Sequence, residues 1–571
     1  MPEKITNITA LILLFIMFLS GFFSYQGDSA TMDELSHIPA GYSYVSQKDF
    51  RINPEHPPLI KSLAGLPLLF LNLNFPSDSW AWNNEVNAQW NFGYDFLYAS
   101  GNNVEQILFW ARLPMLFLLV FLGWFIFYWT KKEFGKNIAL FVLTLFSFSP
   151  TFLAHGRLVT TDIGAVLGFI LGFYFWLKFL RNPSKTNVIA TGFVFGICML
   201  FKFSLALLIP SFAIITLTYA LLNKKNLLKY ILLSILIGVI GTMFVILPVY
   251  QIHVLNYPPE KQLSDTMTLF PVSGIPKKII TFMAGNPATR ALAHYFLGLM
   301  MATHRTATGN TVYFFNRISN SGWWYYFPAV YLLKIPLAFH ILTLLSLSLI
   351  TKTKKEERIK DWIKNHFTEF SMLVFLAIYW GTSMVGILNL GIRHILPVFP
   401  FTYILVGLGL SKIKEMKKPA FRKTGICLIV LLLGWYIFSS LNVYPHYLSY
   451  FNEIVSGTDN GYKYITDSNY DWGQDLKRLT MWVEENNIEK IKIDYFGGGN
   501  VKYYLGNRSE RLNALEGPQK GWLAISANSL QMGKGELVPG FEQDSGYYRW
   551  LDEYEPITRA GKSIFIYHIE D

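Results

Sequence analysis

Long runs of apolar residues, separated by short polar connections, dominate the first 443 residues of the chain. Runs such as residues 11–23 and 116–129 lack the alternation of a half-exposed strand. Many approach the roughly 20 residues that a helix needs to cross a bilayer. The pattern predicts a polytopic α-helical membrane protein and excludes a soluble enzyme and a β-barrel. We expect eleven spans, at residues 6–25, 107–130, 137–155, 161–180, 186–201, 204–221, 230–249, 326–350, 367–388, 391–411 and 424–443.

The positions of the basic residues orient these spans. Lys and Arg gather on alternate connections, at residues 131–136, 178–185, 224–229, 351–365 and 411–423. The positive-inside rule makes these connections and the N-terminus cytoplasmic. Three large segments, 26–106, 250–325 and 444–571, are then extracytoplasmic, the side called outer below. We therefore expect a multi-pass protein of the cell (inner) membrane.

Composition adds little to this picture. The 49 Lys and Arg against 38 Asp and Glu give a net charge of +11, most of which is this orientation signal. A nucleic-acid partner is not expected, because no basic stretch accompanies a recognisable reader of nucleic acid. The lipid bilayer is the expected partner. The two cysteines, Cys198 and Cys427, lie in apolar runs and imply no disulfide framework.

The pattern divides the chain into two domains, a membrane catalytic domain at residues 1–443 and a small soluble α/β domain at 444–571. In the second, a helix begins near Leu476, and three runs predict strands, at residues 490–496, 521–527 and 563–569. The apolar stretch 59–73 is too short to span and predicts an interfacial or re-entrant helix.

A dense polar cluster follows the first span and is the main candidate site. Its charged and imidazole side chains are Asp33, Glu34, His37, Asp49, Arg51, Glu55, His56 and Lys61. Such groups beside a membrane are costly unless they pair or act. The adjacent Asp33 and Glu34 offer a base and its partner in different environments. A solvated loop with a helix cap is the plainer alternative.

The cluster resembles the first external loop of protein O-mannosyltransferases, which are membrane glycosyltransferases of the GT-C superfamily. The shared order is Asp-Glu, His, a Tyr-rich stretch, then acid-His-Pro-Pro-Leu-x-Lys. Other stretches resemble bacterial members of glycosyltransferase family 39, at residues 322–336, 391–401, 447–457 and 467–477. The acid before His-Pro-Pro is Glu55 here, where those proteins commonly have Asp. No room is left for their β-trefoil insert, so protein O-mannosylation is not carried over.

This resemblance implies an inverting transferase that uses a polyprenyl-phosphate sugar as donor. Asp33 is similar to the base that takes the proton from an acceptor hydroxyl, which belongs to a lipid, a glycan or a protein. Glu34 would orient the acceptor or the base. Asp162 resembles a second acid that the superfamily places in the second external loop, although it could equally cap the helix that follows it. No cofactor is implied.

Cations at the outer ends of spans would stabilise the leaving phosphate. The candidates are Lys202, Arg393, His394 and Lys61. Lys202 and Arg393 could instead snorkel to the interface. Further contacts to donor or acceptor are expected from His37, Glu55, His56, Arg157, His304 and Lys334.

A divalent metal is a weaker expectation. Glu55, His56, Asp162 and His304 could supply oxygen and nitrogen ligands, but no metal-binding spacing links them. Protein mannosyltransferases work without a metal, and none is predicted here. The acidic run at 467–475 lacks the Gly and Glu of an EF-hand loop, which favours turn and capping roles.

Two other functions remain as rivals. A transporter or lipid flippase would show paired halves with broken helices in matching places, which the sequence lacks. A non-catalytic protein that binds lipid-linked glycan would not need the acid at position 33. The three readings differ in one structural test: an enzyme requires Asp33, Asp162, Lys202 and Arg393 to converge on one outer cavity.

Overall fold

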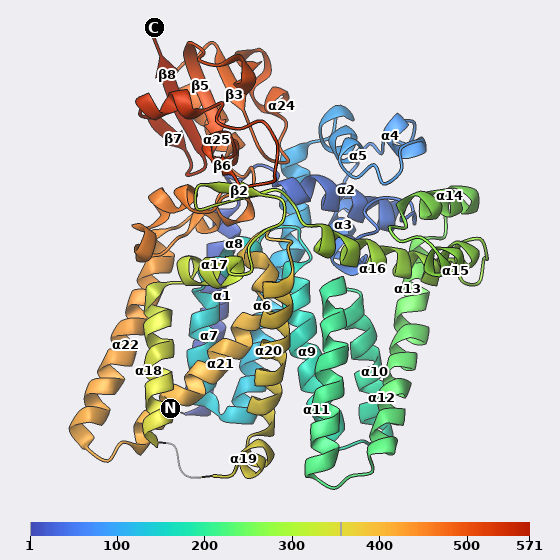
Figure 1. Ribbon diagram of the computed structural model, residues 1–571, viewed down its shortest axis with the longest axis vertical. Coiled ribbons are helices and arrows are strands. Elements are labelled where there is room, and N and C mark those ends of the chain that lie inside the picture. The colour runs from blue at the N-terminus through green and yellow to red at the C-terminus, as the bar shows by residue number, and fades with distance from the viewer. Residues whose placement is uncertain (1, 354–356, 571) are drawn as a thin grey trace.

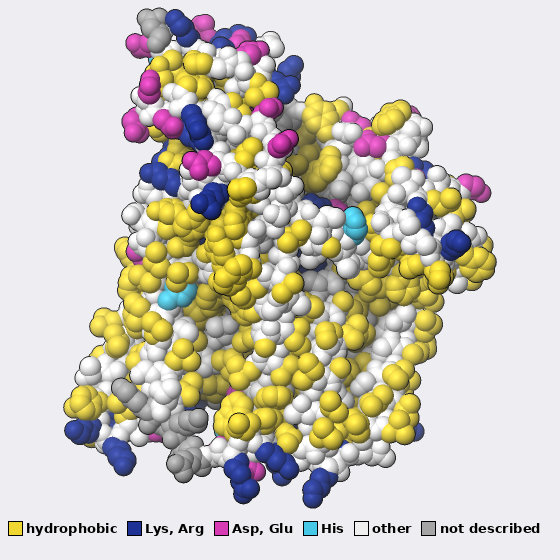
Figure 2. All heavy atoms as spheres, viewed as in Figure 1, with side chains coloured by type: hydrophobic (Ala, Val, Ile, Leu, Met, Phe, Trp, Pro, Cys, Tyr) yellow, Lys and Arg dark blue, Asp and Glu magenta, His cyan; other side chains and the backbone are white. Residues whose placement is uncertain are grey.

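The computed structural model describes residues 2–353 and 357–570 and has three layers (Figure 1). A bundle of long helices forms the lowest layer in this view, short helices lie across its upper end, and a β-sheet stands above them. Figure 2 shows hydrophobic side chains around the bundle and Lys and Arg side chains at its lower end. The chain is a polytopic helical membrane protein, as its apolar runs predict.

Seven helical stretches are long and apolar enough to cross a membrane. They are α1 (Glu3–Ser24), α6 (Val104–Phe134), α9 (Asp162–Arg181), η3 with α11 (Phe203–Leu222), α12 to α13 (Leu227–His253), α20 (Phe367–Val385) and α22 (Pro419–Asn442). An eighth is counted if α17 (Tyr326–Lys334) and α18 (Leu337–Thr353), which are bent by 107°, form one broken span. Pro336 lies at the break, where its ring prevents a continuous helix.

The expected count of eleven full spans is not confirmed. The apolar run 137–155 divides into α7 (Lys136–Ser147) and α8 (Pro150–His155). The runs 186–201 and 391–411 hold the short helices α10 (Lys185–Met199) and, after η5 (Ile392–Ile395), α21 (Val398–Ser411). The 12 residues of α7 extend about 18 Å at 1.5 Å per residue, well short of the hydrocarbon core. Hydropathy does not detect such breaks, because the residues at the breaks are themselves apolar or small.

The first-loop motif lies in the middle layer. Helix α2 (Met32–Ser46) begins with a reciprocal cap between Thr31 and Glu34. Helix α3 (Leu59–Gly65) packs closely against it, because a Cβ on Gly41 would lie 2.1 Å from the backbone oxygen of Lys61. The turn η1 (Leu66–Phe70) follows and leaves the side chain of Phe70 exposed. This is the short helix expected for the stretch 59–73.

The remaining short elements surround this motif or join the long helices. They are α4 (Trp80–Asn83), α5 (Asn91–Tyr94), η2 (Asp95–Ala99), α14 (Pro259–Leu269), α15 (Ile275–Ala284), α16 (Arg290–Thr308), α19 (Ile359–Asn365) and η6 (Lys412–Glu415). Helices α14 to α16 lie beside α2 and α3 in the middle layer, whereas α19 lies at the lower end of the bundle (Figure 1).

The C-terminal sheet has five strands in the order β4-β3-β5-β8-β7. The three predicted strand runs correspond to β3 (Ile491–Asp494), β5 (Gly521–Ser526) and β8 (Ile564–Ile569). Strand β3 is parallel to β4 and β5, and β8 is antiparallel to β5 and β7. The other elements here are β4 (Ser509–Arg511), β7 (Thr558–Ala560), α23 (Leu476–Glu485), α24 (Val501–Leu505), η11 (Gly506–Arg508), η12 (Ala514–Glu516), α25 (Ala527–Lys534) and η13 (Arg549–Glu553).

Two connections attach this sheet to the rest of the chain. Strand β1 (Val312–Phe314) pairs with β2 (Arg317–Ser319), and β2 pairs in parallel with β6 (Glu536–Leu537). The stretch 444–475, with the short turns η7 (Tyr447–Ser449), η8 (Glu453–Val455), η9 (Thr458–Lys463) and η10 (Asp467–Asn469), forms the other. Its Tyr447, Tyr470 and Trp472 are buried in the same core as the bundle helices. This stretch therefore packs with the membrane part as well as with the sheet.

A buried ion pair fixes α2 to the bundle. Arg112 of α6 donates from Nε and Nη2 to the two Glu34 carboxylate oxygens, at 2.8 and 2.7 Å. The backbone N–H groups of Thr31 and Val159 also donate to Glu34. Every oxygen of this fully buried carboxylate is thus satisfied, which a buried charge requires if it is not to destabilise the fold.

We predict that Arg112→Met lowers the free energy of unfolding by about 3–5 kcal/mol, because it leaves the Glu34 charge buried and unpaired. The measurement is a denaturant titration of the purified protein. Lys412→Met is the matched control, since it breaks an exposed ion pair with Glu415 and should cost at most about 1 kcal/mol. Equal losses in the two variants would contradict this role for Arg112.

Candidate active site

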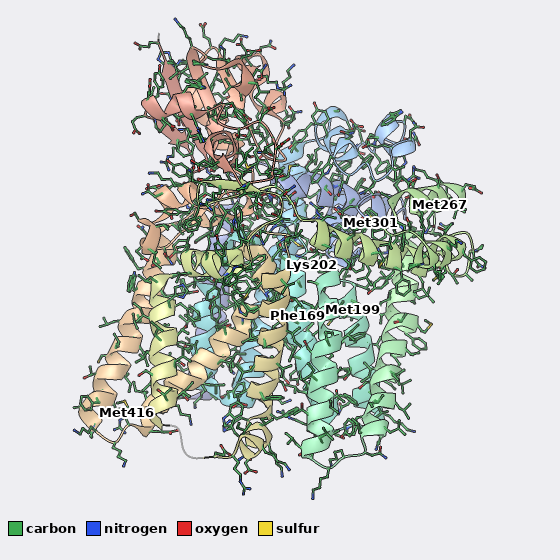
Figure 3. All side chains as sticks on the ribbon, viewed as in Figure 1. Phe169, Met199, Lys202, Met267, Met301 and Met416 are labelled. Atoms are coloured by element: carbon green, nitrogen blue, oxygen red, sulfur yellow. The ribbon has the colours of Figure 1, made fainter. Side chains whose placement is uncertain are left out.

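A cavity of about 880 Å³ lies between the middle layer and the upper end of the bundle. Its polar wall is formed by residues of four segments: α2, the loop after α2, the turn that precedes η3, and η5. Helices α16 and α20 form a more apolar wall. Figure 3 shows Lys202 at the upper end of the bundle, where the bundle meets the middle layer. The predicted site residues that line the cavity are Asp33, His37, Glu55, His56, Lys202, Arg393 and His394.

Four charged groups that are distant in sequence form a chain of contacts at the polar wall. Arg393 Nη1 lies 2.7 Å from Asp33 Oδ2 and 3.6 Å from Asp162 Oδ2. Lys202 Nζ donates to Asp162 Oδ1 at 2.6 Å. Asp162 is buried directly behind the wall, at the first position of α9. Asp33, Lys202 and Arg393 therefore converge on one cavity, whereas Asp162 contacts the two cations from behind the wall and does not line the cavity.

The adjacent acids of α2 face different surroundings. Neighbours on a helix point about 100° apart, so Asp33 lines the cavity while Glu34 points inward to Arg112. Burial opposes ionisation of Asp33, but the charge and hydrogen bond of Arg393 outweigh it and hold the pKa of Asp33 below its ordinary value. Asp33 is therefore an ionised carboxylate at neutral pH.

The stretch 444–475 holds Arg393 in place. The Arg393 guanidinium lies over the Trp472 ring, with 4.3 Å between Cζ and the ring centroid. Asn469 Oδ1 accepts a hydrogen bond from the backbone N–H of Ile392. Gly391, at φ +147°, allows the approach, because a Cβ there would lie 2.5 Å from Ser468 Oγ. The acidic run at 467–475, expected to serve in turns and caps, thus also positions the site.

Asp467 adds a third carboxylate near Arg393. Burial raises the pKa of Asp467 to about 6, although the charge of Arg393 acts in the opposite direction. Asp467 is not among the site residues predicted from the sequence. Its distance of 434 positions from Asp33 hides the relation, which the fold alone reveals.

A hydrogen-bonded polar patch lines the cavity beside Asp33. Ser36 Oγ donates to Gln89 Oε1 at 3.0 Å, and Asn53 Nδ2 donates to Ser36 Oγ at 3.0 Å. Gln89 Nε2 donates to Glu55 Oε1 at 3.4 Å, and Arg305 Nη1 pairs with the same oxygen at 3.0 Å. Of these five residues, Glu55 is predicted from its motif, and Arg305 follows the predicted His304 directly in the chain. Ser36, Asn53 and Gln89 carry no local signal, because neutral polar residues of this kind are common throughout the sequence.

Two histidines complete the polar wall. His37 Nδ1 lies 3.0 Å from the backbone oxygen of Val159, and its ring stands edge-on to that of His56 at 5.2 Å between centroids. Burial lowers the pKa of both rings, well below the ordinary value for His56. Both are therefore neutral at pH 7 and can accept or donate a hydrogen bond without adding charge.

Three predicted site residues lie behind the cavity wall: Glu34, predicted to be catalytic, Lys61, predicted to bind the donor phosphate, and Arg157, predicted to contact donor or acceptor. Glu34 is engaged by Arg112, as described above. Arg157 is buried and pairs with Asp28 at 2.9 Å. Lys61 Nζ donates to the backbone oxygen and the Oδ1 of Asn53, both at 2.7 Å. These groups support the loops that form the wall, and the described structure gives them no contact with the cavity.

Two further predicted residues lie elsewhere. Lys334 Nζ is buried and donates to the backbone oxygens of Leu448 and Asn469, at 2.8 and 2.5 Å. It therefore anchors the stretch 444–475. His304 is exposed on α16 and lies outside the cavity, whereas the next residue, Arg305, lines it. The sequence marked this helical turn but not which of its side chains faces inward.

No group of three or more His, Cys, Asp or Glu side chains suited to a metal occurs within residues 2–353 and 357–570. Of the four ligands considered, Glu55 and His56 line the cavity, Asp162 lies behind its wall and His304 lies outside it. The expectation of a metal-independent site stays a prediction.

Residues 96–250 match the family model described as dolichyl-phosphate-mannose-protein mannosyltransferase. No curated protein sequence matches the chain significantly. The matched region includes α9 and the turn that carry Asp162 and Lys202. The match covers less than half of the chain, so it establishes a resemblance to this family.

Solved structures share the fold at low sequence identity. The S. cerevisiae protein O-mannosyltransferase Pmt1-Pmt2 complex bound to the sugar donor is 10% identical, with a TM-score of 0.52 over 78% of this chain and 90% of that one. The apo oligosaccharyltransferase of Archaeoglobus fulgidus is 11% identical, with a TM-score of 0.50 over 97% and 73%. ArnT from Cupriavidus metallidurans bound to undecaprenyl phosphate is 12% identical, with a TM-score of 0.48 over 97% of each chain. The two matches with TM-scores of at least 0.50 show that the chain has the fold of the GT-C glycosyltransferases, and the family model shows its resemblance to the mannosyltransferases of family 39, as its first-loop motif predicts.

Proposed function

We propose that this protein is an inverting glycosyltransferase that moves a sugar from a polyprenyl-phosphate carrier to a hydroxyl acceptor on the outer side of the membrane. One observation carries the proposal: an ionised carboxylate, Asp33, and two cations, Arg393 and Lys202, line one cavity at the edge of the membrane layer. The resemblance to mannosyltransferases supports the transferase class.

Asp33 is the proposed general base. Its Oδ2 accepts from Arg393, and its Oδ1 accepts no hydrogen bond from a side chain or backbone group in the described ranges. Oδ1 is therefore free to accept the proton of the acceptor hydroxyl. As that proton moves, the acceptor oxygen bonds to the anomeric carbon. The bond from this carbon to the phosphate oxygen breaks, and its electron pair leaves with the phosphate.

Arg393 and Lys202 are the proposed phosphate contacts. Arg393 offers a planar fork of donors and Lys202 a mobile point charge. Asp162 contacts both cations from behind the wall, so we propose it as a positioning residue rather than as a base. The Lys202 side chain is 14% exposed and lines the cavity.

The apolar wall supports a lipid-linked donor. Leu299 and Ala302 of α16, Val385 at the end of α20, and Ile387 and Leu388 just after it line the same cavity. An apolar surface beside the phosphate contacts suits the first units of a polyprenyl tail, because burial of apolar area favours association. The outer location is supported by the Lys and Arg side chains at the opposite end of the bundle (Figure 2).

The first test supplies a panel of radiolabelled polyprenyl-phosphate sugars, with membrane lipid and glycan extract as acceptor, to the purified protein in membranes. We expect turnover of one donor, with a fall of about 10²–10⁴-fold in Asp33→Asn. Donor binding should persist in that variant, because both cations remain. Binding without turnover in wild type and Asp33→Asn alike would contradict catalysis and favour a protein that binds lipid-linked glycan.

A second prediction concerns the pH dependence of kcat/KM, which reports the free enzyme. The base form of Asp33 is lost as the pH falls through its pKa, which Arg393 lowers. In Arg393→Gln, Asp33 stays buried but loses the cation that lowers its pKa. The pKa of Asp33 should therefore rise, and the acid limb should move to higher pH by about 1–3 units.

Lys202→Gln is the matched control for this shift. It also removes a proposed phosphate contact and should raise KM for the donor, but it leaves the pair between Arg393 and Asp33 intact. Its acid limb should stay near that of the wild type. Equal acid limbs in the wild type and both variants would show that Asp33 is not the titrating base.

A further inference from the structure

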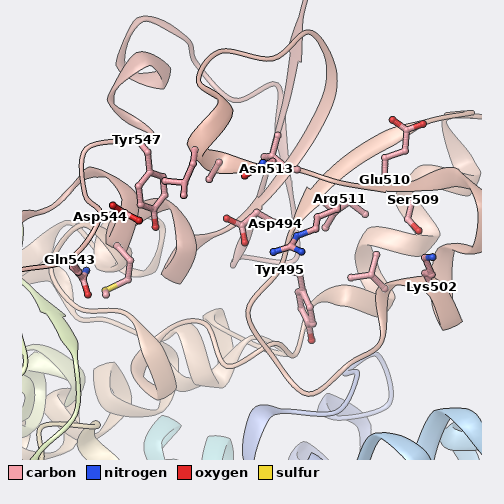
Figure 4. A pocket seen from close by; sticks show the side chains of 16 residues that line it. Asp494, Tyr495, Lys502, Ser509, Glu510, Arg511, Asn513, Gln543, Asp544 and Tyr547 are labelled. Atoms are coloured by element: carbon pink, nitrogen blue, oxygen red, sulfur yellow. The ribbon is translucent and has the colours of Figure 1, made fainter. Parts of the chain in front are cut away.

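A second cavity, of about 710 Å³, lies in the C-terminal sheet and shares no lining residue with the first. It opens beside the carboxyl ends of β3 and β4, which are parallel neighbours in register from Ile491 and Ser509. Figure 4 shows the side chains that converge on it. The crevice at the carboxyl ends of parallel strands is where open α/β sheets generally bind ligands, and the volume is typical of such sites.

Two charged groups face each other in this cavity. Asp494, at the end of β3, is fixed by hydrogen bonds from Ser529 Oγ at 3.0 Å and Tyr548 OH at 2.7 Å. Each carboxylate oxygen keeps a further acceptor site. Arg511, at the end of β4, extends its guanidinium into the cavity (Figure 4). The guanidinium makes no hydrogen bond or ion pair with any residue in the described parts of the chain.

An aromatic ring forms a third wall. Tyr547 is half-buried and packs closely on Gly533, where a Cβ would lie 2.5 Å from the ring. The position of the ring is therefore fixed while part of its surface lines the cavity. Gln543 and Asp544 are exposed beside it and add amide and carboxylate groups. A rigid ring next to forked donors and acceptors suits a ligand with an apolar face and many hydroxyls.

The charge balance argues against an anionic ligand. The lining holds two cations, Lys502 and Arg511, and three carboxylates, Asp494, Glu510 and Asp544. Glu510 is engaged from outside by Lys490 at 3.4 Å, but the two remaining acids still match the two cations. A phosphate would meet repulsion from the fixed Asp494, whereas vicinal hydroxyls can donate to Asp494 and accept from Arg511.

We propose that this cavity binds a neutral, hydroxyl-rich saccharide. The loop that follows β3 contacts two elements of the middle layer: Tyr98 OH of η2 donates to the backbone oxygen of Gly498 at 2.8 Å, and a Cβ on Gly498 would lie 2.2 Å from the backbone oxygen of Thr31, which caps α2. The binding of the saccharide does not depend on the proposed transferase function. Only its use as the acceptor would rest on that function.

The test is calorimetric titration of the full-length protein in nanodiscs with maltose, cellobiose and α-1,6-mannobiose, and separately with inorganic phosphate. We expect at least one disaccharide to bind. Arg511→Gln and Tyr547→Leu should each weaken this binding by roughly tenfold or more. Arg508→Gln is the matched control, because Arg508 is exposed on the same part of the chain and does not line the cavity.

Three results would overturn the proposal: no disaccharide binds, phosphate binds more tightly than every disaccharide, or Arg511→Gln binds as well as the wild type. Asp33→Asn should bind the disaccharide normally. A donor panel that shows no turnover, together with disaccharide binding that depends on Arg511, would reject the transferase function and keep the saccharide site. Turnover of a donor without disaccharide binding would keep the transferase function and reject the saccharide site.

Discussion

The site depends on one guanidinium held among carboxylates where water has little access. Arg393 contacts Asp33 and Asp162 and lies near Asp467. Burying these charges is costly, and their mutual attraction offsets the cost only if the geometry is kept. Three separate parts of the chain keep it: α2 supplies Asp33, the start of α9 supplies Asp162, and the stretch 444–475 supplies the Trp472 ring and the Asn469 anchor. A bound phosphate would add negative charge to this arrangement, and Lys202 is placed to balance it.

Adjacent charged residues in this protein face different surroundings, because helices turn by about 100° per residue. Asp33 faces the cavity, and Glu34 beside it faces the bundle, where Arg112 and two backbone N–H groups satisfy it. The same division separates Arg305, which reaches Glu55 in the cavity wall, from the exposed His304. Glu34, which points inward, keeps the loops in place, whereas Asp33 lies at the cavity surface.

The membrane helices, the C-terminal strands and most of the polar wall could be predicted from the sequence, because their signals are local. Apolar runs indicate helices, and a charged residue beside such a run, such as Lys202 or Arg393, can be recognised from the local sequence alone. The breaks at Pro150 and Pro336 lie within apolar runs, so hydropathy joined them into full spans. Gln89 and Asp467 reach the site through contacts distant in sequence, which no local pattern reports. Lys61 and Lys334 are predicted from the first-loop motif and from an apolar span, respectively, but both ammonium groups donate to backbone oxygens.

In the proposed mechanism, Asp33 accepts a proton in a single displacement and never bonds to the sugar. The anomeric configuration of the product tests this most directly. With a donor of known configuration, the glycosidic linkage of the purified product can be assigned by the one-bond C–H coupling at the anomeric carbon. A configuration opposite to that of the donor is the predicted result. Retention of the donor configuration would require a second displacement through a covalent or ion-paired intermediate, and would contradict the role assigned to Asp33.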